Sequence, residues 1–252
     1  MNHHYSVREI FDTLQGEGVR AGTRAIFIRL AGCNLWNGRE SGRSSGLGAC
    51  ARWCDTDFVR GEPMTSEAIA LRAAELWREP LPTPRGSIAP PWVVITGGEP
   101  ALQLDHALLD ALRAEGFRIA VESNGTKRTD ALLAVDHLCI SPKLGSTLQV
   151  LEADELKVVV PGVADPDPDQ EHRTLAVPFP APTRGMKLLG APLGWTNDDL
   201  DELADAGDWD RLFVSPQDGP RAAIHTAQAI AFVKRHPRWR LSVQTHKVLG
   251  IP

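Results

Sequence analysis

The sequence lacks a long apolar run, a signal peptide and an excess of positive charge. No stretch of the 252 residues is apolar for long enough to cross a bilayer, and the N-terminus lacks the apolar core of a secretory signal. The formal net charge of −5 gives no electrostatic footprint for nucleic acid. Internal repeats are also missing. We therefore expect a cytoplasmic protein with neither a membrane nor a nucleic-acid partner.

Cysteine is scarce and unevenly placed. Three of the four cysteines, Cys33, Cys50 and Cys54, lie in one loop over residues 33–58, which is rich in glycine and serine. Thiols stay reduced in the cytosol, so this cluster favours a metal or redox role over a disulfide framework. An iron–sulfur cluster, a zinc site with a fourth ligand from histidine or Cys139, and unligated thiols all remain open at this point. Cys139 itself lies in an apolar segment and is expected to be a buried small hydrophobe.

The composition is that of one soluble globular domain. Hydrophobic residues make up 42% of the chain and charged residues 23%, both ordinary proportions. Chains of this length commonly form a single α/β barrel domain. We expect one domain over residues 1–252. Residues 161–200 are rich in proline and acidic residues without a clear period, which predicts a loop insertion.

Short apolar segments alternate with segments of helical spacing. Helices are expected at 65–79, 103–115 and around 223–231. About six or seven strands are expected, at 24–30, 91–96, 117–123, 138–141, 155–160, 211–216 and 239–244. Alternation of strand and helix implies parallel pairing. The count is too low for a closed eight-fold barrel, so the predicted fold is an α/β, partial (open) parallel β/α barrel.

Loops of unusual composition follow five of these strands. In barrels of parallel strands, the chemistry lies at the carboxyl ends of the strands. The five segments are the cysteine loop, GGEP (97–100), SNG (123–125), SPK (141–143) and SPQDG (215–219). GGEP alone is weak, because glycine and proline are common where a strand ends in a turn. GGEP together with the cysteine loop is far more specific.

This pair of motifs resembles the radical S-adenosylmethionine superfamily. Within that superfamily, eight motifs in one order resemble the 7-carboxy-7-deazaguanine synthase family. They are EIFDTLQGEG, FIRLAGCNLWNGRE, CDTDF, TGGEP, ESNGT, SPK, ELKVVV and QTHKVLGIP. The resemblance covers nearly the whole chain, apart from the proline-rich segments near 80–91 and 161–200.

The cysteine spacing departs from the family pattern. The superfamily usually places three and then two residues between its cysteines, and a subgroup of this family has about fourteen in the first gap. Here sixteen residues separate Cys33 from Cys50, and three separate Cys50 from Cys54. One added residue turns a helical side chain by about a further 100°. We therefore expect a bulge or kink in this modified cluster-binding loop if both sulfurs serve one cluster.

The resemblance implies three bound groups. Cys33, Cys50 and Cys54 would ligate a [4Fe–4S] cluster with one open iron, and Thr56 would place its hydroxyl on a Mg²⁺ ion, a cation that prefers oxygen ligands. S-adenosylmethionine would be bound by Gly98, Glu99, Ser141, Pro142, Lys143, Ser215, Pro216, Gln217 and Asp218.

The resemblance also implies the substrate site. The residues assigned to it are Leu14, Gln15, Gly16, Arg29, Thr96, His246 and the terminal carboxylate of Pro252. Arg29 lies in an apolar strand, where a buried charge needs a partner such as an anionic substrate. Thr56 in isolation would be a turn or capping residue, and His246 could equally be a surface histidine. Trp36 and Trp53 would shield the cluster from water.

The implied reaction is a radical ring contraction in queuosine biosynthesis. The cofactor would be split to methionine and a 5′-deoxyadenosyl radical, which takes hydrogen from C6 of 6-carboxy-5,6,7,8-tetrahydropterin. Ammonia then leaves and 7-carboxy-7-deazaguanine forms. An electron donor such as flavodoxin and a homodimeric state are also implied. The alternatives are another radical enzyme, such as a glycyl-radical activase, and a non-enzymatic zinc-binding module.

Overall fold

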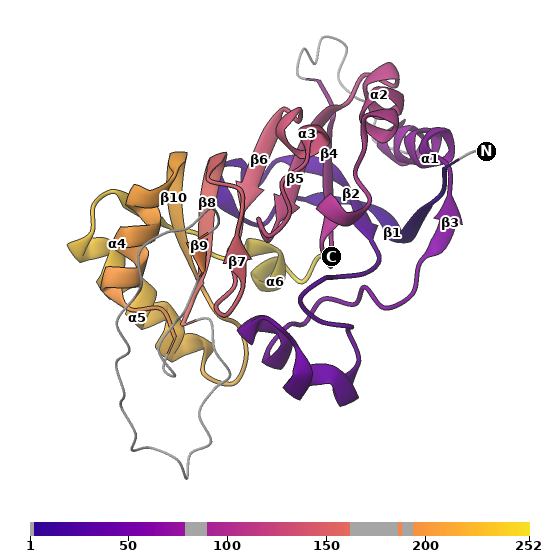
Figure 1. Cartoon of the computed structure of the whole chain (residues 1–252). Coiled ribbons are helices and arrows are strands. Elements are labelled where there is room, and N and C mark those ends of the chain that lie inside the picture. The colour runs from indigo at the N-terminus through magenta and orange to yellow at the C-terminus, as the bar shows by residue number, and fades with distance from the viewer. Residues whose placement is uncertain (1–2, 79–89, 162–185, 188–193) are drawn as a thin grey trace.

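The computed structural model describes residues 3–78, 90–161, 186–187 and 194–252, and a single large sheet runs through them (Figure 1). The strands of this sheet are β1 (Tyr5–Leu14), β2 (Arg24–Leu30), β3 (Glu62–Met64), β4 (Trp92–Gly97), β5 (Arg118–Ser123), β6 (His137–Ile140), β8 (Glu152–Val160), β10 (Asp208–Pro216) and β11 (Trp239–Leu241). Their order is β11-β10-β8-β6-β5-β4-β2-β1-β3. A separate two-stranded ribbon pairs β7 (Thr147–Leu148) with β9 (Met186–Lys187).

The run from β2 to β11 confirms the predicted fold. These seven strands are all parallel to their neighbours, whereas β1 is antiparallel to both β2 and β3. The sheet ends at β11 on one side and β3 on the other, so the described strands form an open, partial barrel.

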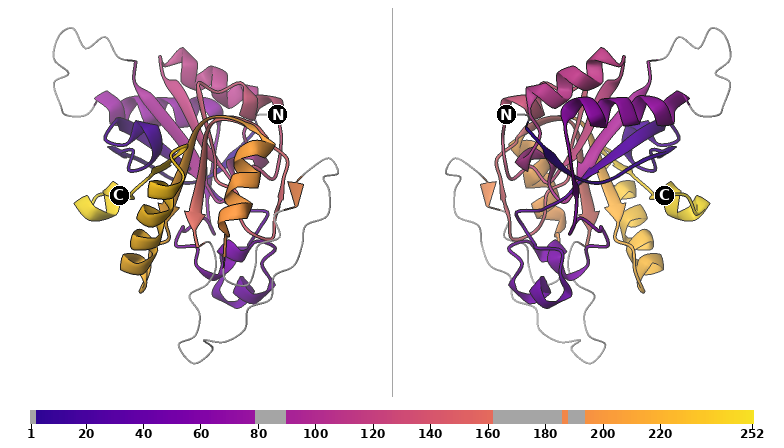
Figure 2. Two further views of the ribbon diagram at one scale, coloured as in Figure 1. Left: turned by 90° about the vertical axis from the view of Figure 1, so that its left-hand side faces the viewer. Right: turned by 90° about the vertical axis from the view of Figure 1, so that its right-hand side faces the viewer.

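Five helices of the described residues cover the outer face of the sheet. They are α1 (Ser66–Arg78), α2 (His106–Ala114), α3 (Asp130–Leu133), α4 (Asn197–Ala206) and α5 (Ala222–Arg235). A sixth, α6 (Thr245–Leu249), lies at the C-terminus beside the concave face. Figure 2 shows α1 and α2 near one end of the sheet, with α4 and α5 at the other. Shorter 3-10 turns are η1 (Gly18–Arg20), η2 (Glu40–Ser45), η3 (Ala49–Arg52) and η4 (Pro100–Leu102). The helices of the described residues are too short or too polar to span a bilayer.

Side-chain alternation along the strands separates the core from the site. On β2, Ile26, Ile28 and Leu30 point outward into the main hydrophobic core beneath the helices. The intervening residues, Ala25, Phe27 and Arg29, face the concave side. The same alternation on the neighbouring strands brings polar side chains to the concave face, beyond a small apolar floor of Ala25, Val94 and Ala120.

Several described elements were not among the predicted ones, namely β1, β3, β7, β9, α3, α4 and α6. Strand β1 lies in a segment for which no strand was predicted, helix α6 lies at the C-terminus, and helix α4 begins inside the expected insertion at 161–200. Thr196 caps α4 in a reciprocal capping box with Asp199. Residues 162–185 and 188–193, which make up most of the expected insertion, lie outside the described residues, as do residues 79–89.

Candidate active site

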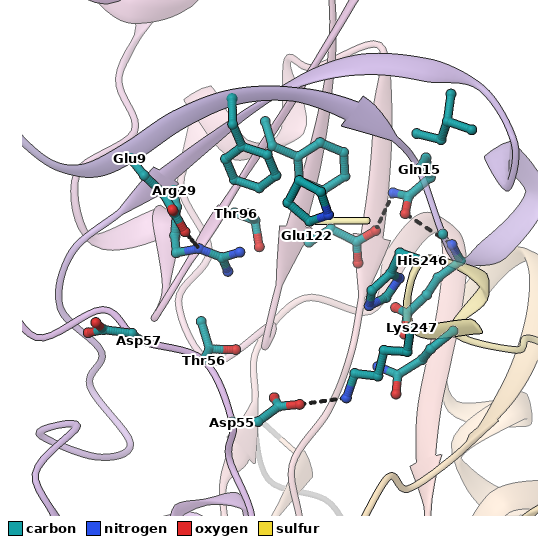
Figure 3. Close-up of a pocket in the computed structure, with 17 residues that line it drawn as sticks. Glu9, Gln15, Arg29, Asp55, Thr56, Asp57, Thr96, Glu122, His246 and Lys247 are labelled. Atoms are coloured by element: carbon teal, nitrogen blue, oxygen red, sulfur yellow. Dashed lines mark hydrogen bonds and ion pairs between the residues drawn. The ribbon is translucent and has the colours of Figure 1, made fainter. Parts of the chain in front are cut away.

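Two adjoining cavities lie on the concave side, at the carboxyl ends of the parallel strands. The "outer cavity" has a volume of about 450 Å³ and is drawn in Figure 3. It is lined by Glu9, Phe11, Leu14, Gln15, Gly16, Glu17, Phe27, Arg29, Asp55, Thr56, Asp57, Thr96, Glu122, Gln244, His246, Lys247 and Pro252. The "thiol cavity", of about 220 Å³, is lined by Cys33, Cys50 and Cys54 together with residues from four strand-end loops. The two cavities share Glu17, Asp55, Thr56, Thr96, Glu122 and Gln244.

The three thiols converge on the thiol cavity despite their unusual spacing. Turn η3 carries Cys50 and ends at Trp53, whose backbone leaves the helical region at φ −134° and ψ 0°. The Cys54 amide then donates to the Cys50 carbonyl at 2.7 Å. The expected kink is therefore a tight 3-10 turn that returns Cys54 to the side of Cys50.

The thiol cavity fits an iron–sulfur cluster better than a single metal ion. Among the described residues, no three His, Cys, Asp or Glu side chains meet closely enough to hold one ion, as a zinc site would require. The thiolates of a cluster bind different irons and therefore surround a cavity rather than one point. Trp53 lines this cavity, and its buried indole nitrogen has no hydrogen-bond partner in the described residues.

Burial raises the pKa of two of the three thiols, Cys50 and Cys33, and so favours their protonated form. Burial raises the pKa of Cys50 to about 12, although Lys143 opposes the shift. Burial also raises the pKa of Cys33, against hydrogen bonds from backbone amides, including that of Leu35 at 3.4 Å. Ligation of iron would therefore release protons from these groups.

The GGEP loop is locked to the start of the cysteine loop by its backbone. The Glu99 amide donates to the Gly32 carbonyl at 2.9 Å. A Cβ atom at Gly98 would lie 2.1 Å from that carbonyl oxygen, and one at Gly97 would lie 2.0 Å from the Leu30 carbonyl oxygen. Glycine is required at both positions because two backbones meet there.

The Glu99 side chain links two loops, and the cofactor-binding role that the resemblance implies for Glu99 stays a prediction. Its side chain is fully buried and lines neither cavity. The carboxylate accepts hydrogen bonds from the Ala101 amide (2.8 Å), the Ser123 hydroxyl (2.8 Å) and the Asn124 amide (2.7 Å). Glu99 thus ties the GGEP loop to the SNG loop, while Gly98 lines the thiol cavity as expected.

The other residues predicted to bind the cofactor divide into two groups. Ser141 and Lys143 line the thiol cavity, and the Lys143 ammonium donates to the Ser141 hydroxyl at 2.5 Å. Pro142 between them is buried and lines neither cavity. Four further residues lie at the end of β10, outside both linings: Ser215, Pro216, Gln217 and Asp218. The role of this second group stays a prediction.

All seven residues predicted to bind substrate line the outer cavity, and Thr56 lines both cavities. Strand register places Arg29 directly beside Thr96. The Arg29 Nε donates to Glu9 at 2.6 Å, and Figure 3 shows the far end of its guanidinium pointing into the cavity between Thr56 and Thr96. The half-buried arginine thus has a protein partner that the sequence did not predict.

His246 is held against the backbone of Gly16. A Cβ atom at Gly16 would lie 2.0 Å from the His246 Nδ1. The backbone amide and hydroxyl of Thr245 both donate to the Gly16 carbonyl at 3.0 Å. Burial lowers the pKa of His246, so this imidazole is neutral at pH 7.

A buried charge cluster that the sequence did not reveal lies at the wall shared by the cavities. Lys157, only 4% exposed, donates to Glu17 at 2.5 Å and to Glu122 at 2.8 Å. Burial alone would raise the pKa of Glu17, but Lys157 outweighs it and sets that pKa at about 2. The Gln15 amide also donates to Glu122, at 3.2 Å. A charged residue in an apolar strand was the available signal, as it was for Arg29.

The fold and the two cavities define an enzyme on a partial β/α barrel, with a thiol-lined cavity next to a polar one. Curated relatives named 7-carboxy-7-deazaguanine synthase are similar to this chain over nearly its whole length. The Burkholderia multivorans protein is 42% identical over 98% of this chain and 99% of its own length. The Bradyrhizobium diazoefficiens protein is 43% identical over the same shares. No family model matches the chain. The crystal structure of QueE from Escherichia coli has the same fold, with a TM-score of 0.59 and 24% identity over 95% of this chain and 93% of that one.

The chain belongs to the 7-carboxy-7-deazaguanine synthase family. Near-full-length identity above 40% confirms the resemblance drawn from the eight motifs, and with it the expected enzyme class. The glycyl-radical activase and the zinc-binding module are therefore set aside.

Proposed function

We propose that the chain converts 6-carboxy-5,6,7,8-tetrahydropterin to 7-carboxy-7-deazaguanine with release of ammonia. The observation that carries this proposal is the pairing of the two cavities. One holds three thiols and the other holds Arg29, with Thr56 and Thr96 on the wall that they share. A cofactor in the first cavity would lie next to a substrate in the second.

Cys33, Cys50 and Cys54 would hold the [4Fe–4S] cluster. When bound, the cluster and S-adenosylmethionine supply the one-electron chemistry that starts the reaction. Around them, Gly98, Ser141 and Lys143 present backbone and polar groups for the cofactor. Trp36, packed edge-to-face on Phe58 with ring centroids 5.6 Å apart, covers the cluster site with apolar surface.

In the outer cavity, each end of the pterin has a complementary partner. The free end of the Arg29 guanidinium would pair with the 6-carboxylate. The carboxylates of Glu17 and Glu122 would accept N–H donors from the aminopyrimidinone edge. His246, neutral at pH 7, would accept or donate a hydrogen bond at the same end.

A Mg²⁺ ion at Thr56 would complete the substrate site. Asp55 and Asp57 flank Thr56 and also line the outer cavity, so the local donors are oxygens. Since no three acidic groups of the described residues meet there, substrate oxygens and water would supply the remaining ligands. The proposal further includes flavodoxin as an electron donor, a homodimeric state and a single domain over residues 1–252.

The test is anaerobic reconstitution with iron and sulfide, followed by product analysis. The loaded enzyme is incubated with S-adenosylmethionine, Mg²⁺, the pterin and dithionite, and products are identified by mass spectrometry. We expect 7-carboxy-7-deazaguanine from wild type and none from C33A, C50A or C54A. Each of these variants should also bind less iron than wild type. C139A is the matched control for iron loading, because Cys139 is buried outside both cavities and should keep wild-type iron. Its activity is not compared, since the thiol faces Glu122. A fully loaded wild type that yields no deazaguanine would refute the substrate assignment.

A further inference from the structure

The C-terminal residues 243–252, here called the strap, cross the open side of the partial barrel. The strap leaves β11 at one edge of the sheet and contacts β1 near the other (Figure 1). Thr245 donates to the Gly16 carbonyl, and the Thr13 hydroxyl donates to the Pro252 carbonyl oxygen at 2.7 Å. Together with β1, the strap therefore closes the side of the outer cavity that no strand of the parallel barrel closes.

Lys247 in the strap joins two further segments. Its ammonium lies 2.6 Å from an Asp55 carboxylate oxygen and 2.7 Å from one of Asp218. Asp55 belongs to the cysteine loop and precedes Thr56, whereas Asp218 follows β10. Figure 3 shows the Lys247–Asp55 pair crossing the rim of the cavity.

A single exposed ion pair contributes little, because water and salt screen it. This arrangement differs in three respects. One ammonium serves two carboxylates, these come from segments far apart in sequence, and Lys247 and Asp55 both line the outer cavity. The contact therefore fixes the position of the strap, which also carries His246 and Pro252 into that cavity.

We propose that Lys247 is a positioning residue. Its ion pair with Asp55 fixes the strap to the cysteine loop and so holds His246 opposite Thr56. The proposal rests on the proposed function for its kinetic test, but not for its structural test. Loss of the Lys247–Asp55 ion pair weakens binding of the pterin, while the rate at saturating substrate is nearly unchanged.

The kinetic test compares reconstituted K247M, K247R and D55N with wild type and with K234M. Lys234 is an exposed lysine on α5, outside both cavities, and serves as the matched control. We expect K247M to raise KM for the pterin about three- to tenfold with kcat nearly unchanged, and D55N to raise KM as well. Because Asp55 also lies beside the proposed Mg²⁺ site, only KM is compared in D55N. K247R, which keeps the charge, should lie close to wild type, as should K234M. Added salt should raise the wild-type KM toward that of K247M.

The structural test is amide hydrogen exchange of the strap in the full-length reconstituted protein, without substrate. We expect faster exchange over residues 243–252 in K247M than in K234M, because the ion pairs of Lys247 no longer restrain the strap. Unchanged strap exchange in K247M overturns the proposal even if wild type makes no deazaguanine. In an active enzyme, a raised KM in D55N but not in K247M, or equal rises in K247R and K247M, also overturns it.

Discussion

Replacement of Lys157 by methionine is expected to destabilise the protein strongly. Lys157 is 4% exposed and is paired with both Glu17 and Glu122. Methionine fills a similar volume without the charge, so the variant leaves two carboxylates facing each other at the wall shared by the cavities. The loss therefore comes from uncompensated buried charge rather than from a cavity.

Two independent routes give a similar magnitude. Removal of one partner from a buried ion pair costs about 3–5 kcal/mol. The pKa of Glu17 is lowered from its ordinary value of 4.5 to about 2, a difference that corresponds to about 3 kcal/mol. For a chain of this size, such a loss lowers Tm by roughly 6–20 °C.

The assay is thermal unfolding of wild type, K157M and the exposed-lysine control K234M across acidic and neutral pH. Because the Glu17 pKa is depressed in the native state, its contribution is complete above pH 4.5 and is lost as pH falls toward 2. The difference between wild type and K157M should therefore narrow in acid. E17Q/K157M should recover part of the loss, because it removes one buried negative charge. A Tm for K157M equal to that of K234M at neutral pH would refute this reasoning.

Two further predictions concern the GGEP loop. G98A should lower the free energy of unfolding by about 1–3 kcal/mol and reduce bound iron after reconstitution, because the new Cβ would lie 2.1 Å from the Gly32 oxygen beside Cys33. G116A, in an open turn far along the chain, should keep normal iron, and equal iron in both variants would count against the argument. E99Q should cost about 1–3 kcal/mol in denaturant unfolding, since an amide cannot accept all three hydrogen bonds that the carboxylate receives. Wild-type stability of E99Q would contradict that account.

The parallel strands were predictable because their outward-facing side chains are large, apolar and buried under the helices. Such side chains give short apolar runs in the sequence. The expected strand at 24–30 coincides with β2, and the helix expected at 65–79 appears as α1. Strand β1 was missed because it lines the outer cavity with Glu9 and Phe11, so charged and apolar residues mix along it. Helix α6 spans only five residues, too few for a helical period.

The site was predictable where a motif carries it and not where distant residues meet. The seven residues predicted to bind substrate all line the outer cavity, and the three cysteines line the thiol cavity. The motifs QGEG, ESNGT and ELKVVV contain Glu17, Glu122 and Lys157, yet no spacing in the sequence shows that these three meet. Their pairing depends on strand order, in which β5 and β8 flank β6. The same limit applies to Lys247, whose partners lie 192 and 29 residues away.

The open sheet accounts for the way the site is assembled. A closed barrel could surround a substrate with strand-end loops alone. Here β11 and β2 are not neighbours, so one side of the outer cavity must be built from chain that is not in the barrel. Strand β1 and the strap supply that side, joined at Thr13 and Gly16. The cysteine loop meets the strap at Lys247, so one loop contributes the cluster ligands, Thr56 and an anchor for the strap. Because these functions share a loop, a change in the length of its gaps must preserve the positions of Cys54 and Asp55, as the tight turn η3 does here.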